Sequence, residues 1–244
     1  MAIVGGGGKT SLLFAAAEAL VGAGRRVVIG TTTKVWQREA RRAPETVLLD
    51  SERNALPAVQ RGLERNGWVF VGRRILENGK VAGVAPEFAD ELFLSSLVDY
   101  LILEADGAAG RSVKAPSEKE PVIPRSATMV AAVAGLDALG KPLDPETVFR
   151  LERFLELTGL KAGDLLEPKH LGMVFESVQG LFKGCPKSAR KIAFLNKCDI
   201  LRSEPEGGGV LVRRLFPGPG CPVHRVVLAS IFENRYVVIH GDDD

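Results

Sequence analysis

The chain has 244 residues, of which 45% are hydrophobic and 25% are charged. This is an ordinary globular mixture, and the chain is long enough to bury one large core. Thirty-two Lys and Arg residues against thirty Asp and Glu leave a formal charge of +2. That balance excludes the strong long-range field with which a protein gathers nucleic acid or anionic lipid.

The three cysteines, Cys185, Cys198 and Cys221, are widely spaced and do not suggest a disulfide framework. The first residues run straight into a glycine cluster, without the basic and apolar regions of a secretory signal. No apolar run reaches the ~20 residues that a membrane-spanning helix needs. We therefore expect a cytoplasmic protein without a membrane or nucleic-acid partner.

The first elements follow the order strand, helix, strand. The apolar run Ala2–Val4 leads through glycines into the Ala- and Leu-rich segment Ser11–Val21, which has helical character. Gly22 and Gly24 end this helix, and the β-branched run Arg26–Ile29 follows. The order predicts a βαβ unit, and so a parallel sheet with right-handed crossovers.

Further apolar runs continue the strand pattern, with helical segments between most of them. They are Val47–Leu49, Trp68–Val71, Tyr100–Leu103, Met129–Val133, Lys191–Leu195 and Val226–Leu228. Asn78 and Gly79 predict a hairpin between Ile75 and Val81. Pro145–Lys183 lacks a strand-like run and predicts two or three helices. We therefore expect one α/β domain over residues 1–244, with a mostly parallel sheet, helices on both faces and a helical insertion at about 144–184.

The strongest local motif is V-G-G-G-G-K-T-S at residues 4–11. Successive glycines let backbone N–H groups converge on phosphate oxygens, and the following helix points its positive end at them. Lys9 supplies a cation for the β- and γ-phosphates, and Thr10 offers a hydroxyl to Mg²⁺. The motif resembles the Walker A sequence of P-loop NTPases, although Ile3 stands where its first glycine is usual. The predicted phosphate site comprises Gly5, Gly6, Gly7, Gly8, Lys9, Thr10 and Ser11; the alternative is a glycine-rich turn that binds nothing.

An apolar strand at 100–103 ends in the sequence E-A-D-G. Side chains alternate along a strand, so Glu104 and Asp106 share one face. A buried strand ending in an acid is how such folds hold magnesium beside the phosphate loop. Either carboxylate could reach the metal while the other orients water, so the candidate catalytic residues are Lys9, Glu104 and Asp106. A solvated strand end is the alternative.

The strand Ile192–Leu195 runs into N-K-C-D, which fits the N-K-x-D base-recognition motif of P-loop GTPases. Asp199 would accept from the ring N–H and exocyclic amine of guanine, the Lys197 stem would lie along the base, and Asn196 would tie loops together. Adenine lacks that donor pair, so the motif favours GTP over ATP. Ala229-Ser230 could contact the guanine oxygen. A chance N-K-x-D in a loop is the alternative.

Two loops follow predicted strands. Thr31, Thr32 and Thr33 come after the second strand, where the carboxyl ends of parallel strands gather ligands. A threonine hydroxyl, assigned here to Thr33, would meet Mg²⁺ or the γ-phosphate; alternatively the threonines only extend the strand. The proline-stiffened segment Lys114–Pro124 could couple nucleotide state to a partner or substrate, or could be a rigid surface connection. The predicted metal ligands are Thr10, Thr33, Glu104 and Asp106.

In combination these motifs resemble the YqeC family. The resemblance spans Val4 to about Ser230 and includes T-T-T-K, K-A-P-S-E-K-E-P-V-I-P and the segment Val133–Gly140. The family is described as accessory proteins of selenium-dependent molybdenum hydroxylases. The resemblance implies a P-loop nucleotide-binding protein that serves the maturation of such an enzyme, with the hydroxylase or its cofactor-handling proteins as partner. It also implies that Lys114, Glu120 and Pro121 form the characteristic loop and that Arg150 contacts an anion.

These motifs lead to three hypotheses. The first is an NTPase that uses Mg²⁺ with GTP or ATP and hydrolyses slowly unless a partner completes the site, with Asp106 or Glu104 positioning water. The second is a small-molecule kinase whose acceptor is held by Lys114 and Arg150. The third is a non-catalytic module in which nucleotide orders the loops to recruit a partner.

Overall fold

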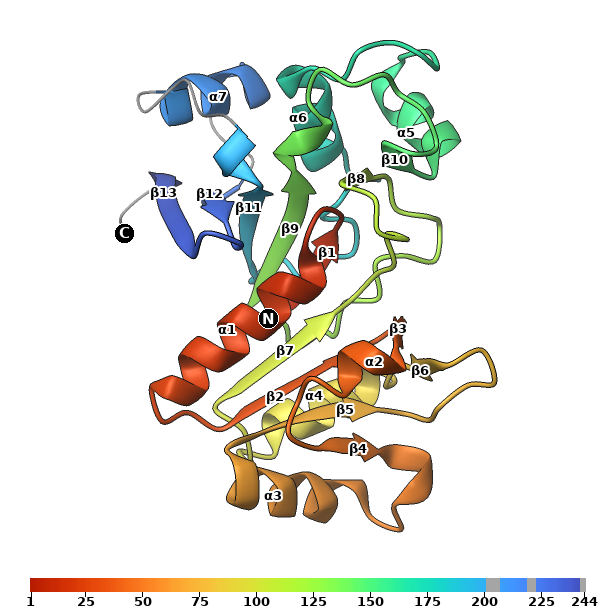
Figure 1. Cartoon of the computed structure of the whole chain (residues 1–244), viewed down its shortest axis with the longest axis vertical. Coiled ribbons are helices and arrows are strands. Elements are labelled where there is room, and N and C mark those ends of the chain that lie inside the picture. The colour runs from red at the N-terminus through yellow and green to blue at the C-terminus, as the bar shows by residue number, and fades with distance from the viewer. Residues whose placement is uncertain (201–206, 219–222, 242–244) are drawn as a thin grey trace. The chain divides into compact units, whose positions relative to one another are not determined.

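A computed structural model describes residues 1–200, 207–218 and 223–241 (Figure 1). These residues form two compact units. The first comprises Met1–Ile3, Thr10–Gly107 and Val122–Thr128, and the second comprises Val4–Lys9, Ala108–Pro121 and the described residues from Met129 onward. Both units combine mainly parallel strands with helices, so the fold is α/β, as the sequence predicts. Its organisation as one domain stays a prediction.

The sheet of the first unit is parallel, with the strand order β1-β7-β2-β5-β4. Its strands are β1 (Ala2–Gly5), β2 (Val27–Thr31), β4 (Thr46–Leu48), β5 (Trp68–Gly72) and β7 (Tyr100–Glu104). Each of them lies on a predicted apolar run, as expected for parallel strands that are buried on both faces. The start of β1 pairs with β7 through Ala2↔Leu103 and Ile3↔Glu104, so even this short run joins the sheet.

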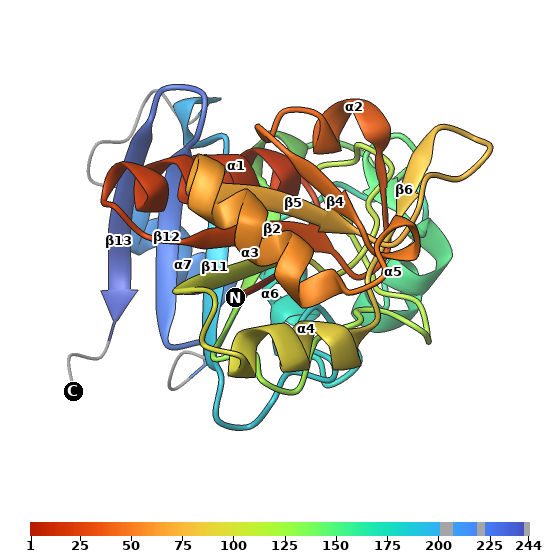
Figure 2. The ribbon, with the colours of Figure 1, turned by 90° about the horizontal axis from the view of Figure 1, so that it is seen from below.

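Helices cover both faces of this sheet. They are α1 (Lys9–Gly22), α3 (Ala55–Asn66) and α4 (Pro86–Leu94). Val59 of α3 and Leu92 of α4 are fully buried in one apolar cluster with alternate residues of the strands. Phe14 of α1 packs edge-on against Trp68, with 6.1 Å between the ring centroids. Figure 2 shows α1 and α4 on opposite sides of these strands.

The predicted hairpin is confirmed in the first unit. Ile75 and Val81 form an antiparallel bridge, and Gly79 takes the left-handed conformation of the turn. The returning strand, β6 (Lys80–Ala82), also pairs antiparallel with β3 (Lys34–Trp36), which precedes α2 (Gln37–Ala40). β3 was not predicted, because only its central residue, Val35, is buried and the strand forms no apolar run.

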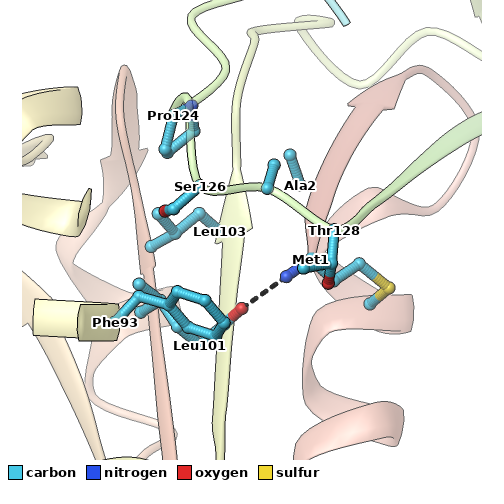
Figure 3. A pocket seen from close by; sticks show the side chains of 9 residues that line it. Met1, Ala2, Phe93, Leu101, Leu103, Pro124, Ser126 and Thr128 are labelled. Atoms are coloured by element: carbon cyan, nitrogen blue, oxygen red, sulfur yellow. Dashed lines mark hydrogen bonds between the residues drawn. The ribbon is translucent and has the colours of Figure 1, made fainter. Parts of the chain in front are cut away.

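A small pocket in the first unit is lined mainly by apolar side chains, among them Phe93, Leu101 and Leu103 (Figure 3). The Met1 nitrogen at its edge donates to the Leu101 carbonyl at 2.7 Å. None of the predicted site residues lines this pocket, so it is not the candidate site.

The sheet of the second unit has the strand order β9-β11-β12-β13. The strands β9 (Met129–Gly135), β11 (Arg190–Asn196) and β12 (Arg225–Ser230) are parallel, and β13 (Arg235–Gly241) is antiparallel. A separate two-residue pair joins β8 (Val113–Lys114) to β10 (Val148–Phe149). Of these, β8, β10 and β13 were not predicted.

The remaining helices belong to the second unit. They are α5 (Leu151–Thr158), α6 (Pro168–Glu176) and α7 (Gly207–Leu215). Phe175 of α6 contacts Phe216 edge-on at 6.0 Å between centroids. The segment 144–184 thus contains two helices, together with the unpredicted β10.

Two expectations from composition concern the whole chain. No helix in the described part of the chain is both long and apolar enough to cross a bilayer. Cys185 and Cys198 are free thiols, and Cys221 lies outside the described residues.

Candidate functional site

The glycine run forms a tight loop between β1 and α1. Gly5, Gly7 and Gly8 have φ values of 94°, 78° and 131°, a region that strains residues with a side chain. A Cβ atom on Gly5 would lie only 2.1 Å from the Val133 carbonyl oxygen of β9. The loop therefore requires glycine at this position for conformation and for close backbone approach.

Two N–H groups of the loop donate to backbone carbonyls of the second unit, to which Gly6 and Gly7 themselves belong. Gly6 donates to Val133 and Gly7 donates to Arg111, each at 2.9 Å. These two groups are thus not available to converge on phosphate, contrary to the simplest interpretation of the motif. A phosphate at this loop would be met by Gly8 and by the first turn of α1, where helix geometry leaves N–H groups outside the helical ladder.

Lys9 lies within the loop that it is predicted to serve. Its side chain folds back so that Nζ donates to the Gly5 carbonyl at 2.8 Å, and the residue is only 4% exposed. The ammonium group is thus held beside the glycine backbone.

The next residue, Thr10, contacts a predicted acid in the first unit. Its Oγ1 donates to Glu104 Oε2 at 2.9 Å. Glu104 is 7% exposed and Asp106 is 1% exposed, so this strand end is not solvated. Hydroxyl and carboxylate oxygens suit Mg²⁺. Because the described residues include no cluster of three or more His, Cys, Asp or Glu side chains fit for a metal, phosphate and water would have to complete the coordination.

The three threonines bind the backbone of the first unit. Thr31 Oγ1 donates to the Glu104 carbonyl at 2.8 Å, and Thr32 Oγ1 donates to the Val122 carbonyl at 2.7 Å. Thr33 Oγ1 lies 3.2 Å from Thr31 Oγ1. Within the part of the chain that the structure describes, Thr33 has no hydrogen bond to Thr10 or Glu104. Its assignment as a metal ligand stays a prediction.

Asn196, at the end of β11, connects three segments of the second unit. Its Nδ2 donates to the Gly7 carbonyl at 2.8 Å, and its Oδ1 accepts from the Ile231 N–H at 3.2 Å. A Cβ on Gly8 would lie 2.3 Å from the same Nδ2 atom. The buried amide therefore ties the phosphate loop to the N-K-C-D segment and to the end of β12.

Lys197 is held by two residues that the sequence did not single out. Its Nζ donates to Ser112 Oγ at 2.8 Å and to Asp137 Oδ2 at 2.9 Å. Burial raises the pKa of Asp137, but hydrogen bonds from Lys197 and Ser112 outweigh it and leave the pKa lowered. An acid two residues beyond the end of β9 is the signal that could have found Asp137, because Asp106 stands likewise beyond β7.

Asp199 is half-buried on a short 3₁₀ turn, Cys198–Ile200. Its carboxylate has no hydrogen bond to any described residue. The turn after β12 lies beside the N-K-C-D segment. Arg235 donates to Cys198 Sγ at 3.7 Å, and the Ile231 N–H donates to Asn196 Oδ1. Between these two anchors Phe232 is 95% exposed. Ala229 and Ser230 are buried, and Ser230 Oγ accepts from the Glu233 N–H.

Lys114, Glu120 and Arg150 form an ion-paired cluster in the second unit. Glu120 Oε2 accepts from Lys114 Nζ at 2.9 Å and also from Arg150 Nη1. The Lys114 side chain is fully buried. Lys183 donates to the Ser117 and Glu118 carbonyls and thereby fixes the loop between Lys114 and Glu120. The two cations predicted to meet an anion are thus bound to a carboxylate of the protein itself.

This cluster predicts a pH-dependent stability. Burial raises the pKa of Glu120, but Arg150 and Lys114 together lower it from 4.5 to about 2. A lowered folded-state pKa stabilises the protein above pH 4.5, and this contribution disappears as the pH falls toward 2. We expect Glu120→Gln to reduce the free energy of unfolding by about 2 kcal/mol at pH 6 and by much less near pH 2.5. Urea unfolding at several pH values measures this difference.

Glu118→Gln is the matched control, because Glu118 is exposed in the same loop and has no ion pair among the described residues. A Glu120→Gln penalty that stays constant from pH 6 to pH 2.5 would show that the ion pairs are not its cause.

Known proteins resemble this chain over most of its length. The model of the family described as "YqeC protein" matches residues 1–152. The "Uncharacterized protein YqeC" of Escherichia coli (strain K12) is 36% identical over 203 residues, which cover 81% of this chain and 75% of that protein. The chain belongs to the YqeC family.

The region that matches the YqeC model contains most of the geometry described above. It includes the glycine loop, the Thr10–Glu104 pair, and the cluster of Lys114, Glu120 and Arg150. The N-K-C-D segment lies beyond residue 152, outside the part of the chain that the family model matches. The family model therefore gives no support to base recognition, which is argued below from the geometry of Asn196 and Asp199.

Proposed function

We propose that this chain binds a nucleoside triphosphate with Mg²⁺, favours GTP over ATP and hydrolyses it slowly, in the maturation of a selenium-dependent molybdenum hydroxylase. The observation that carries this proposal is the 2.8 Å hydrogen bond from Asn196 Nδ2 to the Gly7 carbonyl. It joins the segment predicted to select the base to the loop predicted to hold the phosphates, within one unit. Phosphates at the loop and a base at Asp199 could then belong to one nucleotide.

Lys9 provides the charge for the phosphates. Its ammonium group already lies beside the loop backbone, where a phosphate oxygen would replace the Gly5 carbonyl as a stronger, charge-assisted acceptor. No long side-chain movement would be required, so little conformational entropy would be lost on binding.

Thr10 and Glu104 provide oxygen ligands for the metal. Thr10 and Glu104 would hold Mg²⁺, which would neutralise phosphate charge when bound, and phosphate and water would supply its other oxygen ligands. Asp106 is almost fully buried near the end of the same strand, and a carboxylate in this environment could orient the attacking water. Without a partner to stabilise the developing charge we expect turnover to be slow.

The two rival functions receive less support. A kinase would use Lys114 and Arg150 to hold its acceptor, but both are bound to Glu120. A non-catalytic module would use the nucleotide to order the threonine loop, but the hydroxyls of Thr31 and Thr32 already bind backbone carbonyls. Hydrolysis requires neither the release of Lys114 and Arg150 from Glu120 nor a rearrangement of the threonine loop.

Calorimetric titration with Mg–GTP and Mg–ATP, combined with phosphate release in the absence of any acceptor, tests the proposal. We expect GTP to bind at least about tenfold tighter than ATP. This factor corresponds to the binding free energy of the hydrogen bonds that Asp199 is proposed to accept from guanine but not from adenine. Slow phosphate release without an acceptor separates an NTPase from a kinase. Absence of binding heat for both nucleotides would refute the nucleotide site. Nucleotide-dependent capture of a hydroxylase component tests the proposed partner.

A further inference from the structure

A small antiparallel sheet in the first unit places cationic side chains on one face. β3 and β6 pair Lys34 with Ala82 and Trp36 with Lys80. The segment before β6 joins through the Ile75↔Val81 bridge, which sets Arg74 opposite Ala82. Paired residues lie on the same side of a sheet and side chains alternate along each strand. Lys34, Trp36, Arg74 and Lys80 therefore share one face.

The opposite face of this small sheet is its inner face. Val35 is 5% exposed and Val81 is 1% exposed. The sheet is also anchored to the strand that precedes it, because Gly83 donates to the Thr33 carbonyl at 2.6 Å and Val84 donates to the Thr31 carbonyl at 2.9 Å. These backbone hydrogen bonds hold the small sheet in place, and its outer face carries Lys34, Trp36, Arg74 and Lys80.

The outer face concentrates positive charge around an exposed aromatic ring. Trp36 is 44% exposed, Lys80 Nζ lies 4.7 Å from its ring centroid, and the Arg38 guanidinium lies 5.8 Å from it. Lys34 and Arg74 are exposed. Among the described residues, none of these four cations has an ion pair or a side-chain hydrogen bond.

Several other exposed arginines of the same unit pair with neighbouring acids. Arg26 pairs with Asp99 at 2.9 Å, Arg65 pairs with Glu45 at 2.6 Å, and Arg73 pairs with Asp50. The one carboxylate that contacts this face among the described residues, that of Glu39, accepts from the Trp36 backbone N–H at 3.2 Å and forms no ion pair with the four cations.

We propose that this surface, the Trp36 face (Lys34, Trp36, Arg38, Arg74 and Lys80), is a docking site for an acidic protein segment. Carboxylates of the partner would supply the counter-charges that the face lacks. Trp and Arg are also the residue types that contribute most to binding at protein interfaces. This inference does not depend on nucleotide binding.

The chemistry of the face favours an acidic protein over a nucleic acid. Binding of single strands relies on aromatic rings on which bases stack, and here Arg38 and Lys80 lie over the Trp36 ring. The formal charge of the chain is only +2, so no broad field surrounds the face to follow a phosphate backbone.

Fluorescence anisotropy of a labelled ten-residue oligoglutamate peptide with the full-length protein tests the proposal. We expect Lys34→Glu/Lys80→Glu to weaken peptide binding at least about tenfold relative to wild type. Arg25→Glu/Arg53→Glu is the matched control, because it changes the net charge equally at exposed positions of the same unit. It should alter the affinity by less than about threefold. Equal losses in the two double variants, or no binding by wild type, would overturn the proposal.

Intrinsic fluorescence gives a second measurement that needs no charge reversal. The chain has two tryptophans, Trp36 and Trp68. Peptide binding should change the wild-type emission, and Trp36→Phe should abolish that change; a change that survives would place the peptide elsewhere. An oligothymidylate of equal charge completes the test. If it binds more tightly than the peptide and loses affinity in Lys34→Glu/Lys80→Glu, the face takes nucleic acid and the proposal fails.

Discussion

Lys9→Ala should lower the affinity for Mg–GTP by roughly 30- to 150-fold. The substitution removes the ammonium group held beside the glycine loop, and a hydrogen bond to a charged group is worth about 2 to 3 kcal/mol. Calorimetric titration of the variant and of wild type with a non-hydrolysable GTP analogue measures the change. Inorganic tripolyphosphate should lose affinity by a similar factor, because Lys9 is proposed to contact phosphate and not the base.

Lys9→Met retains the length of the stem and separates the loss of charge from the loss of packing at this 4% exposed position. Lys119→Ala, at an exposed lysine, serves as the surface control. An unchanged affinity in both Lys9 variants would mean that the loop has been wrongly assigned.

Asp199→Asn should weaken GTP binding by about 100-fold and shift the preference toward XTP. The carboxylate is proposed to accept from two donors of guanine, whereas an amide offers a donor that suits the additional oxygen of xanthine. The loss of two hydrogen bonds to a charged group accounts for this magnitude. Competition between GTP, ATP and XTP for wild type and variant measures the change in preference.

Cys198→Ser provides a control within the same motif, because it keeps the side-chain size at a position beside Asp199. It should leave the order of preference unchanged. If Asp199→Asn weakens GTP and XTP to the same extent, the carboxylate acts on the structure of the turn and not on the base. The comparison with Lys9→Ala is then informative, since that substitution should affect all three nucleotides alike.

The principal strands could be predicted because parallel strands are buried on both faces and appear as continuous apolar runs. This holds for β9 and β11, whose central residues are all buried. It fails for β8 and β10, which have two residues each, and for β3. It also fails for β13, where Tyr236, Val237 and Val238 are all substantially exposed and no alternation marks the strand.

The glycine loop could be predicted because its chemistry is local. Glycines in succession, then lysine and threonine at the start of a helix, specify a conformation and a charge within a few residues. The placement of Glu104 and Asp106 on one face stays a prediction, because β7 ends at Glu104 and Asp106 lies two residues beyond it, where strand alternation no longer applies.

Only the tertiary structure decided which partners these residues have. Gly6 and Gly7 direct their N–H groups to Val133 and Arg111, and Asn196 reaches Gly7 across 189 residues of sequence. Lys197 binds Asp137, 60 residues away, and Lys114 and Arg150 share Glu120.

The sequence by itself therefore determined the order of the strands along the chain, the position of the loop and the family. The tertiary structure decided which charges are neutralised within the protein and which, as on the Trp36 face, have no ion pair among the described residues. The physical reason is that charge compensation depends on distances of a few ångströms between residues far apart in sequence, and those distances are set by packing.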